Sequence, residues 1–417
     1  MAYATMAVIV STNGEEQRVK RNLQKDASIW TKHLVTLAIA VFAVNVGQGF
    51  LRGANTNFFI DTLGLSGGQV LWLAGIREIP GLALMFIAAL IMRWQCSRRA
   101  AASILLMAIG YGLYSVVHSF SALIAISLIA SLGFHNWMPL QSTLSLSLTT
   151  KENSGKVLGS LSAVSALASI TGMGLIMLSS RFFESLSLRA FYVFGGVAMA
   201  VGALLIATLP KSLGEAHSSQ PRILLHRRYW LYYVLIFFEG SRMQVFGAFG
   251  TLVLVQNYGL QVWEISLLLL VSGVVNFLIV PLFGRLLDRF GERIMLSTSY
   301  VALALCFVGY ATFHNAWLLG ACLICINLLV TLRMGLSTYV NRIAPPGELM
   351  PTLSAGVSIN HLTSVSMSLL AGTLLGIVGY EALCWGAATI IMISVPFALM
   401  LKVKLPTAVQ VTRASAE

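Results

Sequence analysis

Long, continuously apolar stretches recur along the whole chain. A stretch of about 20 apolar residues can cross the hydrocarbon core of a bilayer as a helix, which satisfies its backbone hydrogen bonds internally. We place twelve such segments, at 33–56, 68–92, 100–119, 121–147, 156–179, 188–209, 229–257, 261–284, 293–313, 315–341, 353–378 and 380–401. Because the segments do not alternate apolar and polar residues, a transmembrane β-barrel is excluded. The sequence therefore predicts an all-α membrane protein with twelve transmembrane helices.

The composition agrees with insertion into a membrane. Of the 417 residues, 57% are hydrophobic and only 10% are charged. The apolar run at residues 1–10 is too short to span and has no basic residues before it, so we interpret it as tail and not as a signal peptide. The C-x-x-C pair Cys322 and Cys325 lies inside an apolar segment and is interpreted as core thiols. No metal and no cofactor is expected.

Basic residues gather in alternate connections between the segments. The two tails and every second loop carry most of the Lys and Arg residues, whereas the opposite loops hold only Arg181 and Arg189. The positive-inside rule then predicts that both termini are cytoplasmic, in the plasma membrane, the inner membrane of a bacterium. The net charge of +12 is a topology signal that faces anionic lipid, and no nucleic-acid partner is expected.

The second half of the chain resembles the first at a constant offset. A shift of 195 residues places Gly64 and Leu65 on Gly259 and Leu260, and it also aligns the loops 90–99 and 285–294. Two parallel repeats of six helices are an architecture of secondary transporters, which bind substrate between the repeats. We expect an N-terminal tail at 1–32, a six-helix bundle at 33–210, a linker at 211–228, a six-helix bundle at 229–402 and a C-terminal tail at 403–417.

The loop after the eighth segment carries a sequence motif, GRLLDRFGERI. It resembles the cytoplasmic signature of the major facilitator superfamily, G-x-x-x-D-R-x-G-x-R, at the five positions Gly284, Asp288, Arg289, Gly291 and Arg293. The resemblance implies two pseudo-symmetric six-helix bundles and a transporter that works by alternating access, and not an enzyme. It also implies that the motif is a gate, in which Asp288 accepts hydrogen bonds at the N-terminus of a helix from the other half. A merely solvated basic loop is the alternative.

The chain departs from the family pattern in three places. The equivalent loop of the first half has Ala89, Arg93 and Cys96 where the motif has glycine, aspartate and glycine. The fourth segment lacks the arginine of proton-coupled drug exporters, and the fifth lacks their G-P-x-x-G-G run. These absences weaken an assignment as a multidrug antiporter.

Several ionisable residues lie inside the apolar segments. A charge at the centre of a bilayer costs about 2.5–3.5 kcal/mol or more, so it needs a partner or water. Arg77, Glu78, Glu239 and Arg242 are too deep to reach an interface, and Glu239 and Glu78 are the candidates for proton coupling. By resemblance, residues of the first, fourth, seventh and tenth segments line the cavity, and the candidates are Asn45, Gln48, Arg52, His135, Asn136, Glu239, Arg242, Gln244 and Arg333.

Plain structural roles stay open for several of these residues. Glu239 and Arg242 are three residues apart and could simply pair with each other. His135 and His361 could be hydrogen-bonded helix-packing residues, Phe246 could be core, and Asn45 and Gln48 could only bond between helices.

Taken with the resemblance, these features predict a monomeric secondary active transporter that moves a small organic solute across the lipid bilayer, driven by protons. Arginines outnumber carboxylates within the segments, which favours an anionic or zwitterionic solute. Export of drugs or lipid-like compounds is the alternative. A membrane sensor or a membrane enzyme is a third possibility, but we find no output domain and no catalytic set.

Overall fold

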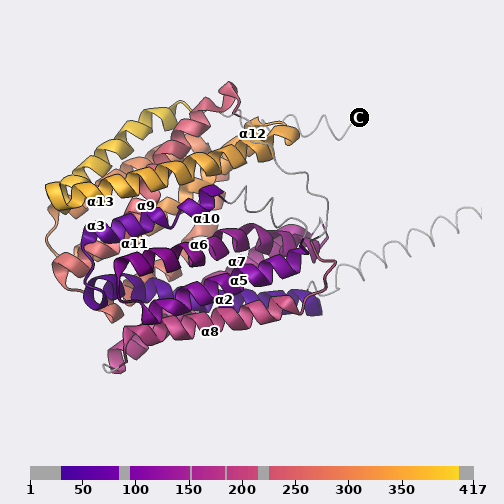
Figure 1. The fold of residues 1–417 in the computed structure, drawn as a ribbon. Helices are drawn as coiled ribbons and strands as arrows, with labels where there is room; N and C mark the ends of the chain where they lie inside the picture. Colours follow the sequence, from indigo (N-terminus) through magenta and orange to yellow (C-terminus); the bar gives the residue numbers. More distant parts are fainter. Residues whose placement is uncertain (1–29, 84–93, 151–152, 184–185, 215–224, 403–417) are drawn as a thin grey trace, which may run out of the picture.

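The computed structural model describes residues 30–83, 94–150, 153–183, 186–214 and 225–402 (Figure 1). The side chains of Gln244 and Pro346 are also outside the description. Most of the predicted N-terminal tail, all of the C-terminal tail, part of the linker, and Ala89 and Arg93 therefore lie outside the described residues.

The first half of the chain begins with a long helix. Helix α2 (Lys32–Asn57) runs on into a π-helical turn, η1 (Phe58–Thr62). After α3 (Gly67–Ile76), the described helices of this half are α5 (Cys96–Gly112) with η2 (Leu113–Val116), α6 (Phe120–Ser147), α7 (Ser154–Phe182) and α8 (Leu188–Ala207).

The second half contains two very long helices, each of which is broken by a glycine. Its elements are η4 (Arg227–Tyr229), α9 (Trp230–Tyr258), α10 (Val262–Thr312), α11 (Ala316–Leu329), η5 (Val330–Arg333), α12 (Met334–Ile343) and α13 (Pro346–Leu399). Gly291 in α10 and Gly379 in α13 have φ angles of 78° and 79°, where each helix turns back. With these two divided and α11 to α12 taken as one, the described helices correspond to the twelve predicted segments, the second of which is described only as far as residue 83.

The helices pack as two bundles of six. In the first half α2 packs against α7 and α8, and α5 packs against α6 and α8. In the second half α13 packs against α9 and α10, and α10 also packs against α11. The bundles meet along two seams, α3 with α13 and α7 with α10. Figure 1 shows the bundles one above the other, with the start of α2 and the end of α13 at the same end of the molecule.

The turns after α2 and α9 agree with the internal repeat. Gly64 and Gly259 have φ angles of 64° and 68°, a conformation that glycine adopts without strain. The next residue of each turn donates its backbone N–H six residues back, from Leu65 to Phe59 at 2.9 Å and from Leu260 to Leu254 at 3.2 Å. The following helices, α3 and α10, both start with a capping box, formed by Ser66 with Gln69 and by Gln261 with Glu264. Equivalent positions thus have equivalent local structure.

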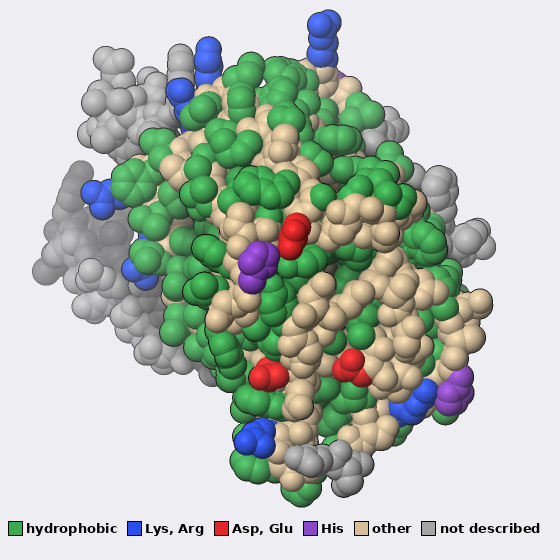
Figure 2. Space-filling view, turned by 90° about the vertical axis from the view of Figure 1, so that its left-hand side faces the viewer, with side chains coloured by type: hydrophobic (Ala, Val, Ile, Leu, Met, Phe, Trp, Pro, Cys, Tyr) green, Lys and Arg blue, Asp and Glu red, His purple; other side chains and the backbone are tan. Residues whose placement is uncertain are grey.

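The halves are joined at the end of the molecule opposite the termini. There Asn57 donates to the Leu260 carbonyl at 2.9 Å, and the Trp72 indole donates to the Leu369 carbonyl at 3.1 Å. Figure 2 shows this end: hydrophobic and uncharged side chains cover most of it, with acidic side chains among them and basic ones toward the rim. Within the described part of the chain, positive charge is not concentrated on this face.

The glycines of α7 and α10 differ in how closely they are packed along the two helices. In the joined part, a Cβ at Gly273 of α10 would lie 3.0 Å from Ile170 of α7. Nearer the termini, a Cβ at Gly159 of α7 or at Gly284 of α10 would meet no described atom within 4 Å. At Gly159 and Gly284 the described structure thus has open space beside the backbone, whereas Gly273 is packed against α7.

Candidate functional site: a polar cavity between the two halves

A cavity of about 400 Å³ lies between the bundles, and helices of both halves line it. Its walls differ in character. The wall from the first half comes from α2, α3, the turn after α3, and α7, and the wall from the second half comes from α9, α10 and α11. Its polar and charged lining residues include Arg52, Asn55, Arg77, Glu78, Thr251, Ser272, Asn276 and Asn327.

All charged groups in the described lining of the cavity belong to the first half. Arg52 of α2 is exposed to the cavity and makes no hydrogen bond or ion pair with another described residue. Arg77 donates to the hydroxyl of Tyr111 at 3.0 Å, which holds its guanidinium at the cavity wall. Glu78, the next residue along the chain, is the carboxylate of this wall.

The polar side chains of α2 do not all face the cavity. Arg52 and Asn55 line the cavity, and Asn55 accepts a hydrogen bond from Tyr192 at 2.9 Å. Asn45 donates to the Val41 carbonyl at 2.8 Å and to Ser165 at 3.4 Å, a contact between helices. Gln48 has a buried Nε2 atom without a partner among the described residues. Arg52 and Asn55 therefore face the cavity, whereas Asn45 faces α7.

The described wall from the second half is polar but uncharged. Asn327 of α11 donates to Ser272 at 3.2 Å, and Asn276 of α10 donates to the Asn327 backbone carbonyl at 3.4 Å. The Oδ1 atom of Asn276 is buried and has no partner among the described residues. The sequence-based prediction missed both asparagines. A lone amide in an otherwise apolar segment was the available signal, because such a group needs a partner in the bilayer.

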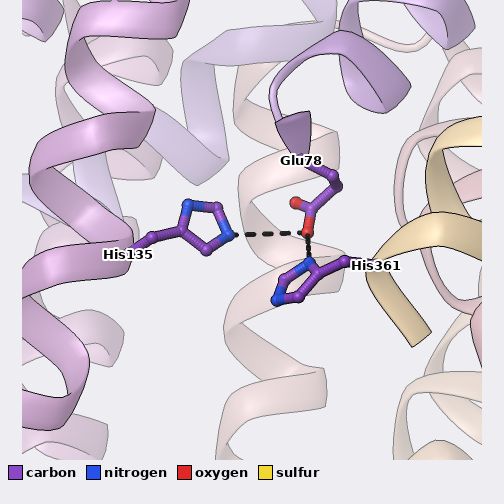
Figure 3. Close-up of side chains that lie close together, drawn as sticks. All are labelled: Glu78, His135 and His361. Carbon is purple, nitrogen blue, oxygen red and sulfur yellow. Dashed lines mark hydrogen bonds and ion pairs between the residues drawn. The ribbon is translucent and has the colours of Figure 1, made fainter. Parts of the chain in front are cut away.

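Glu78 is the centre of a cluster that bridges the halves (Figure 3). His361 of α13, in the second half, donates from Nδ1 to Glu78 Oε2 at 2.9 Å. Nε2 of His135, on α6 of the first half, lies 3.5 Å from the same oxygen. The side chains are 16%, 11% and 6% exposed for His361, Glu78 and His135, so bulk water does not screen these contacts.

The hydrogen bonds of His135 fix where its proton lies. Its Nδ1 is 2.9 Å from the carbonyl oxygen of Ser131, which can only accept, so Nδ1 carries the hydrogen. In a neutral imidazole Nε2 then has no hydrogen, yet it faces the carboxylate oxygen of Glu78. Nε2 is therefore the ring nitrogen of His135 through which a proton could pass to or from Glu78.

The cluster depends on the absence of a side chain at Gly81. A Cβ there would lie 2.8 Å from Cδ2 of His135 and 2.8 Å from Cε1 of His361. The three donor atoms lie within 4.8 Å of one another, a spacing at which two imidazoles and a carboxylate can also share a metal ion. The 2.9 Å contact between His361 and Glu78, however, joins nitrogen and oxygen directly, as in a hydrogen bond.

Glu239 and Arg242 of α9 pair with each other, 2.5 Å apart, and both are buried. The Arg242 guanidinium carbon also lies 4.2 Å from the centre of the Tyr300 ring. Neither residue lines the cavity between the halves. Arg242 and Phe246 instead line a second, mostly apolar cavity of about 320 Å³ within the second half. This placement agrees with a structural ion pair between Glu239 and Arg242, which was one of the roles that the sequence left open.

The described lining also lacks the candidates Asn45, Gln48, His135, Asn136 and Arg333. Asn136 donates to the Leu132 carbonyl of its own helix at 2.9 Å. Arg333 is exposed and contacts the sulfur of Met243 at 2.7 Å. The side chain of Gln244 lies outside the described residues.

The predicted gate motif is held by contacts within the second half. Asp288 pairs with Arg342 at 3.0 Å, and Nε of Arg342 lies 2.9 Å from the buried Glu292. Among the described residues, the partner of Asp288 thus lies on α12 of its own half. Gly291 forms the turn between the two parts of α10, and Gly284, Arg289 and Arg293 flank it, with Arg289 over the Phe290 ring at 5.3 Å.

Comparisons with known proteins agree with this architecture. Among solved structures, the nucleoside transporter NupG aligns with a TM-score of 0.74 and 18% identity, covering 90% of this chain and 100% of that one. A D-xylose–proton symporter gives 0.70 and 14%, covering 89% and 98%, and the human organic anion transporter MFSD10 gives 0.58 and 14%, covering 88% and 100%. No curated protein sequence matches the chain. These identities show the fold alone.

The family comparison is more specific than the shared fold. The family model described as Major Facilitator Superfamily matches residues 37–334 and 232–417, which together span most of the sequence. The match extends over both six-helix bundles and includes the loop motif from Gly284 to Arg293. The chain belongs to the Major Facilitator Superfamily and is a transporter, not an enzyme.

Proposed function

We propose that this protein is a secondary active transporter that moves a small organic solute, anionic or zwitterionic, by proton-coupled alternating access. The observation that carries the proposal is the cavity between the halves. Its described wall has an arginine without a partner, Arg52, and a proton-accepting cluster around Glu78 lies at its edge.

Alternating access is supported by the way the halves meet. They are joined by hydrogen bonds at the end opposite the termini, and the cavity lies between them. A rocking motion of one bundle against the other would open the joined end, so that the cavity faces each side in turn.

Proton coupling is supported by the Glu78 cluster. Its three side chains come from both halves, so a change in their charge acts directly on the contact between the bundles. A proton bound at Glu78 removes the charge that accepts the His361 N–H, which weakens the α3–α13 seam. The other titratable groups nearby are His135, Arg77 and, in the same cavity, Arg52. This geometry favours Glu78 over Glu239, which is paired with Arg242 away from the cavity.

The charge on the cavity wall supports an anionic or zwitterionic solute. In the described lining there are two arginines and one carboxylate, and the carboxylate already accepts from His361. An arginine guanidinium matches a carboxylate or phosphate with two parallel hydrogen bonds. The solved relatives include transporters described as carrying nucleosides, D-xylose and organic anions, and a cavity of about 400 Å³ holds a molecule of that size.

Export of an amphipathic compound is a second candidate function. The observation in its favour is the cavity in the second half, whose lining is almost wholly apolar apart from Ser241 and Arg242. A susceptibility screen of cells that lack or overproduce the protein separates this function from solute uptake.

We further propose that the end with the termini faces the cytoplasm of a bacterial cell, that the protein works as a monomer, and that the linker 211–228 joins the two bundles. The alternate distribution of basic residues supports the orientation. Reporter fusions at the two termini and in the opposite loops test it directly.

Transport in proteoliposomes tests the proposal as a whole. Purified protein is reconstituted, an inward or outward pH gradient is imposed, and labelled organic anions, zwitterions, neutral sugars and organic cations are offered. We expect accumulation of an anion or zwitterion, together with proton movement reported by an internal pH dye. Accumulation of organic cations alone, or solute movement that ignores the pH gradient, would reject it.

A further inference from the structure

The two walls of the central cavity differ in the chemistry that they offer to a bound molecule. Every charged residue in the described lining, namely Arg52, Arg77 and Glu78, belongs to the first half. The polar groups in the described lining from the second half are hydroxyls and amides, on Thr251, Ser272, Asn276 and Asn327. A ligand that satisfies both walls must therefore itself have two different ends.

One cation of the charged wall has no partner among the described residues. Arg77 is held by Tyr111, and Glu78 is held by His361, whereas Arg52 makes no hydrogen bond or ion pair with a described residue. A guanidinium that faces a cavity inside a membrane protein has five N–H donors and no acceptor. The ligand group that satisfies it is an anion, and a carboxylate matches the fork of Arg52 with two parallel hydrogen bonds.

The uncharged wall offers acceptors as well as donors. Asn276 donates to the Asn327 carbonyl, but its Oδ1 atom is buried without a partner among the described residues. Ser272 accepts a hydrogen bond from Asn327, and its hydroxyl can still donate one. A neutral group that both donates and accepts satisfies such a wall, and the smallest is an alcohol. An apolar tail would leave the Asn276 oxygen unpaired, which is unfavourable.

We infer that the cavity selects a hydroxylated carboxylate, such as a sugar acid, whose carboxylate binds Arg52 and whose hydroxyls bind the Ser272–Asn276–Asn327 wall. This inference rests on the proposed transport function and names the substrate class of the same site. Such a molecule joins the two halves when it binds, because its ends are held by different bundles. A neutral sugar lacks the group for Arg52, and a fatty acid lacks the groups for the asparagines.

The inference is tested by ligand binding to the full-length purified protein in detergent, measured by thermal shift and calorimetry. The probes are lactate, gluconate and glucuronate, with glucose as the neutral partner and hexanoate as the apolar partner of similar length. The variants are Arg52→Gln and Asn276→Leu. Arg285→Gln and Asn341→Leu are the matched controls, because both residues are exposed outside the cavity.

We expect gluconate or glucuronate to stabilise the wild-type protein, and glucose and hexanoate to do so far less. Arg52→Gln should weaken binding of the hydroxylated carboxylate by about ten- to a hundredfold, the effect of one charged hydrogen-bonded pair. Asn276→Leu should weaken it while leaving hexanoate unchanged or improved. The two control variants should bind as the wild type does.

Three results would overturn the inference: no binding of any hydroxylated carboxylate, equal binding of hexanoate, or full affinity in Arg52→Gln. The proteoliposome assay with the broader solute panel separates this failure from failure of the transport function. If the protein accumulates another anion or a zwitterion, the proposed transport function stands and only the inferred substrate class is rejected.

Discussion

Thr56 on α2 and Thr251 on α9 are 195 residues apart, and their side-chain oxygens lie 2.8 Å from each other. The offset is the one that relates the two halves, as Gly64 and Gly259 show by their similar conformation. Two equivalent positions of a two-fold repeat can touch only near the axis that relates them. The contact therefore marks the pseudo-symmetry axis, at the closed end of the cavity that both residues line.

A disulfide at this axis should stop transport. In the double variant Thr56→Cys/Thr251→Cys the sulfurs come close enough to bond, and the bond would fix the end that must open. We expect oxidation to lower the initial rate of uptake by about tenfold or more and a reductant to restore it. Each single cysteine variant serves as the control, since the native cysteines are also present in it. Full transport by the oxidised, cross-linked protein would mean that this end does not open.

The space at Gly81 should be essential for the proton cluster. Gly81→Ala places a methyl group 2.8 Å from both imidazoles, so His135 and His361 must move away from Glu78. We expect the variant to fold, but to lose most of its pH-driven uptake, measured in proteoliposomes. The matched control is Gly112→Ala, whose added methyl lies 4.0 Å from its nearest neighbour. Normal pH-driven uptake by Gly81→Ala would show that the contacts among the three residues are dispensable.

The architecture could be predicted from the sequence because its signals are local. The length of an apolar run sets whether a helix spans, and the repeat was visible in short matches such as Gly64-Leu65 with Gly259-Leu260. The structure refined these predictions where the chain turns sharply. At Gly291 and Gly379 the connection between two spans is so short that α10, with 51 residues, and α13, with 54 residues, each contain two predicted spans.

The pair of Glu239 and Arg242 should matter for stability more than for transport. Glu239→Gln leaves a buried guanidinium without its countercharge, which typically costs about 3–5 kcal/mol. We expect a clearly lowered melting temperature in detergent, with the remaining folded protein still transporting. The double variant Glu239→Gln/Arg242→Met removes both charges and should regain much of the loss. If Glu239→Gln were as stable as the wild type, the pair would have no structural role.

Arg342 should hold the turn that carries the family motif. It is the partner of Asp288 and of Glu292, whose side chain is fully buried. Arg342→Ala leaves the Glu292 carboxylate with only the Thr338 hydroxyl among the described residues, a loss of about 3 kcal/mol or more. We expect Arg342→Ala to melt at a lower temperature than the wild type. Arg342→Lys should melt at a temperature between the two. Arg285→Gln is the control, because this exposed residue of α10 lies before the same turn at Gly291, and the variant should melt as the wild type does.

The candidate site could be predicted only in part from the sequence. Depth within a segment identified Glu78, because an ionisable residue in a span needs a partner or water. The family resemblance identified Arg52 as a cavity candidate. The sequence could not bring His361 to Glu78, since they are 283 residues apart and meet only where the two halves touch. The sequence also could not bring Arg342 to Asp288, a pair that forms beside the turn at Gly291, and the contact of Asp288 with the other half stays a prediction.

The central claim is that Glu78 carries the coupled proton. The most direct measurement compares Glu78→Gln, Glu239→Gln and the wild type in proteoliposomes, recording solute counterflow and accumulation driven by a pH gradient. We predict that Glu78→Gln keeps counterflow, which needs no net proton movement, but loses pH-driven accumulation and proton uptake. Accumulation by Glu78→Gln at the wild-type level, with folded Glu239→Gln inactive, would contradict this claim and return the proton site to Glu239.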